Sequence, residues 1–121
     1  MTVTRRALAL SLALIAAAPA LAHHGWRWTE GGKFELTGTV TEADLGNPHG
    51  VLTMDADGEI WTVEVGQPWR NERAGLTDEM MAPGAELTIL GARSADPEEL
   101  LVKAEAVTIG DQSYELYPGR L

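Results

Sequence analysis

The stretch Phe34–Gly50, FELTGTVTEADLGNPHG, decides the fold. Its first half alternates: Phe, Leu, Gly and Val occupy positions 34, 36, 38 and 40, and Glu or Thr occupies each position between them. Side chains alternate across a strand, so we expect a half-buried strand with one solvated face. Gly38 lies on the apolar face and predicts a bulge or sharp bend there, which the first strand of a small barrel needs.

The second half of this stretch ends in the turn GNPHG, residues 46–50. Proline fixes its own φ and drives Asn47 toward an extended conformation. The flanking glycines permit unusual dihedral angles. We therefore expect His49 to be held in a rigid turn at the end of a strand.

Beyond this turn the chain consists of short β-rich segments separated by turn signals. We expect strands over residues 51–55, 59–65, 85–92, 100–109 and 113–117. Asp57–Gly58 joins the first two of these segments and predicts a type I′ hairpin, because both central residues of that turn need positive φ.

One segment, 67–76, interrupts the strands with proline near its start and glycine near its end, which predicts a short helix. Thr77 is expected to cap a further turn. Three strands, a helix and two strands is the order of the OB-fold. We therefore predict an all-β fold with one short helix: a small OB-fold-like barrel of five to six strands, β-β-β-α-β-β. An SH3-like barrel or an open sandwich is the alternative.

The first 22 residues have the pattern of a secretory signal peptide, with Arg5 and Arg6, then an apolar run, then small residues. Ala20 and Ala22 place the cleavage before His23, and a cut after Ala20 is the alternative. An uncleaved anchor is less favoured, because the apolar run is short for a bilayer span.

Cleavage divides the sequence into a signal peptide (1–22), an N-terminal arm (23–33) and the OB-like barrel domain (34–121). Without Arg5 and Arg6, 7 of the 9 Lys and Arg remain against 18 Asp and Glu, a net charge of −11. Such a charge disfavours nucleic acid and anionic membrane surfaces. The chain has no cysteine, so disulfides and thiolate sites are excluded. We expect a periplasmic protein without stable membrane insertion after cleavage.

Several of these segments resemble, in order, a family of exported bacterial proteins, DUF6152. The resemblance is carried by HHGW at 23–26, FELTGTVTE at 34–42, NPHG at 47–50, WTVE at 61–64, GLT at 75–77 and APG at 82–84. It covers nearly all of residues 23–117. It implies a small OB-like barrel and an exported protein, and it brings no catalytic residues, because the family has no known function.

The histidines His23, His24 and His49 are the candidate metal ligands. If cleavage exposes His23, its α-amino nitrogen and imidazole can chelate one metal, and His24 or His49 can add a third nitrogen. Nitrogen donors without thiolate suit Cu(II), then Zn or Ni. With the alternative cut the chain begins Leu21-Ala22-His23, and an N-terminal X-X-His also binds Cu(II). Solvated tail histidines and a structural His49 are the competing interpretation.

The sequence contains no motif that indicates a catalytic site, so we expect a binding protein and not an enzyme. The serines Ser94 and Ser113 lie in no nucleophile-elbow motif. The carboxylates of the strands and turns, Glu64 among them, are expected on solvated faces.

The helix supplies a candidate partner site in Trp69, Arg70 and Arg73, since tryptophan and arginine are enriched in interfaces. Trp61 alternates with Val63 and Val65 and is expected in the core. The sequence therefore predicts a small periplasmic binding protein with possible Cu(II) binding. The alternative is an accessory module without metal that docks onto another envelope protein through its helix.

Overall fold

The computed structural model describes residues 25–121, and the signal-peptide prediction, His23 and His24 lie outside that range. Its elements are β1 (Phe34–Asp44), β2 (Val51–Ala56), β3 (Glu59–Glu64), α1 (Pro68–Ala74), the 3-10 turn η2 (Glu79–Met81), β4 (Glu86–Arg93), β5 (Leu101–Ile109), β6 (Gln112–Glu115) and the 3-10 turn η3 (Pro118–Arg120). The predicted order of strands and helix is confirmed. Among the described residues no helix is long and apolar enough to cross a membrane.

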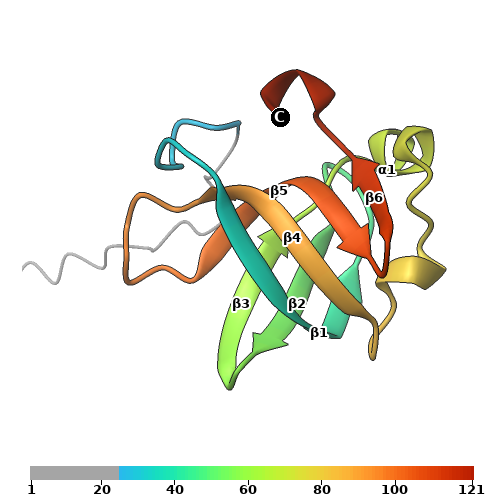
Figure 1. Cartoon of the computed structure of the whole chain (residues 1–121), viewed down its shortest axis with the longest axis horizontal. Helices are drawn as coiled ribbons and strands as arrows, with labels where there is room; N and C mark the ends of the chain where they lie inside the picture. Colours follow the sequence, from blue (N-terminus) through green and yellow to red (C-terminus); the bar gives the residue numbers. More distant parts are fainter. Residues whose placement is uncertain (1–24) are drawn as a thin grey trace, which may run out of the picture.

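The strands close into a barrel (Figure 1). Neighbours follow the order β3-β2-β1-β4-β5 with antiparallel pairing, and a parallel pairing of β3 with β5 completes the ring. That last pairing sets Thr62 opposite Leu101 and Glu64 opposite Lys103. β6 extends the sheet beyond β5 as a hairpin. The fold is thus all-β with a closed five-stranded, OB-like barrel and one short helix, as predicted.

The alternation of β1 places its apolar face in the barrel core. Leu36 and Val40 are buried, whereas Thr37 and Thr39 are exposed. Trp61 is buried, as expected, and its ring stacks on Phe34 at 5.1 Å between centroids. The centre of the core is fully buried and comprises Leu52, Met54, Val63, Ile89, Val102 and Val107. Each such side chain stabilises the fold by about 1.5–3 kcal/mol relative to exposure.

Gly38 has a different role from the predicted bulge. The pairing of β1 with β2 shifts register between Val40 and Glu42, after the glycine. At Gly38 itself a Cβ would lie 2.5 Å from the carbonyl oxygen of Asp55. Glycine is needed there because the backbone of β2 approaches too closely for any side chain.

Two hydrogen bonds connect the helix α1 to Gly66, which lies just after the end of β3. Asn71 is buried, and its amide group donates to the carbonyl oxygen of Gly66 (3.0 Å) and accepts from the Gly66 N–H (2.9 Å). Gly75 ends the helix in the left-handed conformation at φ 85°. The expected Thr77 cap was wrong: η2 has no side-chain cap, and Thr77 accepts from Met80 N–H through its backbone oxygen.

A buried carboxylate joins the N-terminal arm, β5 and the C-terminal segment. Glu105 is 1% exposed, and its two oxygens lie 2.8 Å from Lys33 Nζ and 2.9 Å from Arg120 Nε. Lys33 also donates to the carbonyl oxygen of Arg120. The backbone oxygen of Glu105 accepts from Leu116 N–H at 2.8 Å. Both ends of the described chain are therefore held against β5.

We expect Glu105→Gln to lower the free energy of unfolding by about 1–3 kcal/mol, because two cations lose a charged acceptor that is buried. Urea denaturation followed by tryptophan fluorescence measures the change. The control is Glu35→Gln on the exposed face of β1, for which we expect less than about 0.5 kcal/mol. Equal losses in the two variants would contradict the role of Glu105.

Candidate functional site

A pocket of about 290 Å³ opens at the end of the barrel where β3 leads into α1. It draws on five separate segments: the arm, the turn before β2, the start of α1, β5 and the C-terminal segment. Its lining comprises Gly25, Trp26, Pro48, His49, Gln67, Arg70, Lys103 and Tyr117. The pocket therefore combines aromatic walls with cationic groups and one imidazole.

His49 enters the pocket from a turn that is clamped to the end of β3. The N–H of Gly50 donates to the carbonyl oxygen of Gly66, and the carbonyl oxygen of Gly50 accepts from the N–H of Val65, both at 2.9 Å. The imidazole Nε2 lies 3.2 Å from Oε1 of Glu64, and the side chain of His49 is 22% exposed. The expectation that Glu64 is solvated was wrong, because the parallel closure of β3 on β5 covers this carboxylate.

Lys103 is the buried cation of the pocket. It lies opposite Glu64 in the closing pair of strands, and its residue is 7% exposed. Its Nζ donates to the carbonyl oxygen of Gly25 at 3.1 Å and lies 4.6 Å from the centroid of the Trp26 ring. Burial lowers the pKa of Lys103 below its ordinary value of 10.5, and the charge of Glu64 partly opposes this.

Arg70 and Tyr117 form the opposite wall. The Arg70 guanidinium lies 4.2 Å from the Tyr117 ring centroid and 4.5 Å from that of Trp69. Burial raises the pKa of Tyr117 above 10.0, with the charge of Arg70 acting in the other direction. Trp26 meets Tyr117 edge to face at 5.0 Å, and Arg120 covers Trp26 at 3.7 Å. Cations and rings thus alternate around the pocket.

The structure separates the predicted site residues into two groups. His49 lines the pocket, and His23 and His24 lie outside the described residues. Within residues 25–121 no group of three or more His, Cys, Asp or Glu is placed to hold a metal.

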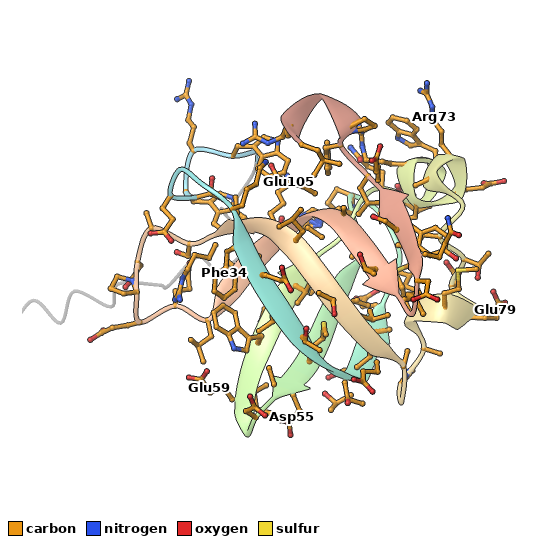
Figure 2. The ribbon with its side chains drawn as sticks, viewed as in Figure 1. Phe34, Asp55, Glu59, Arg73, Glu79 and Glu105 are labelled. Carbon is orange, nitrogen blue, oxygen red and sulfur yellow. The ribbon has the colours of Figure 1, made fainter. Side chains whose placement is uncertain are left out.

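The predicted partner residues lie on α1. Trp69 is 52% exposed, and Figure 2 shows Arg73 extending from the helix away from the barrel. Arg70 is half-buried and turns inward, where its Nη1 donates to the carbonyl oxygen of Leu116 at 3.1 Å. Arg70 therefore belongs to the pocket as well as to the exposed face of the helix.

Sequence reasoning missed Glu64, Lys103 and Tyr117 as members of one site. Glu64 and Lys103 are brought together by a parallel pairing that no local pattern announces. A usable signal was present in Val102-Lys103-Ala104-Glu105-Ala106-Val107, where two charged residues interrupt an apolar strand. Charged residues inside such a strand need partners, which indicates a built polar site.

Comparison with known proteins supports the family and the fold. A family model described as "Family of unknown function (DUF6152)" matches residues 11–100. No curated protein matches the sequence. Among solved structures, the S. pombe Stn1–Ten1 complex is similar with a TM-score of 0.52 and 17% identity, covering 66% of this chain and 59% of that chain. The ZRD-deleted mutant of TiaS in complex with agmatine is similar with a TM-score of 0.50 and 16% identity, and the match covers 69% of this chain and 26% of that chain. This chain thus spans about a quarter of TiaS, and at these identities the similarity shows the fold alone.

We expect Lys103 to titrate below 10.5 in the folded protein, because burial penalises its charged form. The sequence has two lysines, so ¹³C-lysine NMR gives two titration curves, and Lys33→Arg assigns them. Between the folded-state pKa and 10.5 the unfolded chain binds more protons, so the contribution of Lys103 to stability rises with pH in that window.

Trp26→Ala is expected to return the pKa of Lys103 toward 10.5, because it admits water to the ammonium group. Ile60→Ala, an exposed position on β3, serves as the control and leaves the curve unchanged. A midpoint at or above 10.5 in the unmodified protein would refute the assignment.

Proposed function

The chain belongs to DUF6152, a family without a known function, and from the geometry of its pocket we propose that it is an exported periplasmic binding protein rather than an enzyme. The polar groups at the pocket are suited to holding a ligand: an imidazole, an ammonium and a guanidinium converge on about 290 Å³. The serine Ser94 has a structural contact that agrees with a binding role rather than a catalytic one. Its Oγ accepts a hydrogen bond from the N–H of Asp96 and so stabilises the loop after β4.

The ligand that we propose is Cu(II) or another divalent metal, bound by His23, His24 and His49. One observation carries the proposal: Gly25 and His49 line the same pocket. The carbonyl oxygen of Gly25 is held by Lys103, and the Cα atoms of His24 and Gly25 are about 3.8 Å apart through their peptide bond. The residue that directly follows the two arm histidines in the sequence thus lies at the pocket that His49 lines.

The donor set fits such a metal. Imidazole and amine nitrogens suit Cu(II) before Zn or Ni. The Glu64 carboxylate lies 3.2 Å from Nε2 of His49 and orients the ring, and a carboxylate is a usual second partner of a metal-binding histidine. Lys103 and Arg70 oppose a cation, and Glu64 counteracts them, so we expect moderate rather than extreme affinity.

A second candidate function is docking onto another envelope protein through Trp69, Arg70 and Arg73. The exposure of Trp69 (52%) favours it, because a large aromatic residue in water is available to anchor a partner. The arginines beside it suit an acidic surface on that partner.

The metal proposal is tested by calorimetry on protein exported to the periplasm, so that its N-terminus is authentic. We expect Cu(II) binding with a dissociation constant of about 1 µM or tighter. His49→Ala should weaken binding at least tenfold, whereas Asn47→Ala in the same turn should not. Absence of heat, or equal affinity in the His49 variant, would exclude the site.

The docking proposal is tested by cross-linking in intact cells. We expect Trp69→Ala to abolish a specific cross-linked species that Ile60→Ala retains. The two residues are a matched pair, since they are 52% and 55% exposed and lie on different elements. Retention of the species in both variants would contradict a role for Trp69.

A further inference from the structure

We propose that the pocket binds a small aromatic carboxylate, with Arg70 and Lys103 holding the carboxylate and the rings of Trp26 and Tyr117 packing against its apolar body. This site goes beyond the metal proposal and needs no histidine from the arm. It rests on the charge distribution, the hydrogen-bond donors and the shape of the described pocket.

Cations are concentrated at this end of an otherwise acidic protein. The chain has 18 Asp and Glu against 9 Lys and Arg. Nevertheless Arg70, Lys103 and Arg120 each lie within 6 Å of the ring centroid of Trp26 or Tyr117. Such a group of like charges favours an anion, since a negative charge between them relieves their mutual repulsion.

The nearby carboxylates are already engaged. Glu105 is shared between Lys33 and Arg120, and Glu64 contacts His49. Neither Arg70 nor Lys103 forms a salt bridge within residues 25–121. The two cations of the pocket therefore lack a direct anionic partner among the described residues.

Both cations also retain hydrogen-bond donors. A guanidinium has five N–H groups, and Arg70 uses one on Gln67 (3.1 Å) and one on Leu116 (3.1 Å). An ammonium has three, and Lys103 uses one on Gly25. Within the described part of the chain the other donors of these two groups make no hydrogen bond. A carboxylate matches them, because a planar guanidinium binds two oxygens at once.

The volume of the pocket and its aromatic lining indicate the size and character of the ligand's apolar part. Its volume of about 290 Å³ lies near the lower end of ligand pockets, roughly 300–1,000 Å³, which suits one ring and its carboxylate. Trp26 and Tyr117 meet edge to face at 5.0 Å and 87°, so together they form one aromatic wall against which the ring of a ligand can pack. Glu64 lies behind the lining, beside His49 and opposite Lys103, and its charge repels a second negative charge, so a monoanion is favoured over a dianion.

The test uses the full processed protein in the presence of EDTA, so that no metal contributes. Benzoate is the probe, benzamide its neutral isostere and acetate the ring-free carboxylate. We expect benzoate to bind with a dissociation constant of about 0.1–1 mM. Benzamide and acetate should bind at least tenfold more weakly. NMR of the tryptophan indole N–H signals reports the site, with Trp26→Phe assigning the signal that moves.

Two arginine variants then test which cation binds the carboxylate of benzoate. Arg70→Gln should weaken benzoate binding at least tenfold. Arg93→Gln is the matched control, because Arg93 also lies over two rings, at 5.3 Å from Phe34 and 5.0 Å from Trp61, but outside the pocket. If Arg70→Gln does not fold, Arg70→Lys keeps the charge and removes the planar fork, and the same loss is expected.

Some outcomes would overturn the inference. These are equal binding of benzoate and benzamide, an unmoved Trp26 signal, equal losses in the Arg70 and Arg93 variants, or binding that appears only after Cu(II) is added. The two proposals are separated by the probe and the metal: benzoate binding in EDTA should be weakened by Arg70→Gln, whereas Cu(II) binding should be weakened by His49→Ala.

Discussion

The parallel pairing of β3 with β5 is the constraint on which the other features depend. It closes the barrel, and in doing so it buries Glu64 and Lys103 opposite one another. No salt bridge joins these two side chains among the described residues, but the charge of Glu64 favours the charged form of Lys103 across the pairing. The pairing thereby places Lys103 of β5 in the lining of a polar pocket. Residues far apart in sequence, from the arm to the C-terminal segment, then complete its walls.

The pocket is chemically mixed, and this bears on both proposed ligands. An imidazole beside a carboxylate suits a metal ion, whereas a guanidinium and a buried ammonium suit an anion. The two sets come from different elements: His49 comes from the turn before β2, and Arg70 and Lys103 come from α1 and β5. A metal ion and an organic anion need not exclude each other, because each offsets the charge of the other.

Local patterns predicted the fold well because they report local physics. Alternation in β1 and positive φ at Asp57 and Gly58 are properties of neighbouring residues, and both are observed. The site was predicted only in part. His49 could be located from its turn, but the pairing of Glu64 with Lys103 depends on a register between distant strands. The bulge expected at Gly38 failed for the same reason, since the approach of Asp55 is a tertiary contact.

The hairpin at Asp57–Gly58 lies at the far end of β2 from the pocket. The pair Val51–Glu64 marks the pocket end of this ribbon and Ala56–Glu59 its tip. At about 3.3 Å per residue, the strand keeps the two some 17 Å apart. A dye, a surface linker or an inserted reporter domain attached to that loop would leave the binding chemistry undisturbed. The hairpin is therefore a site by which the barrel could be immobilised on a sensor chip with its pocket facing the solution.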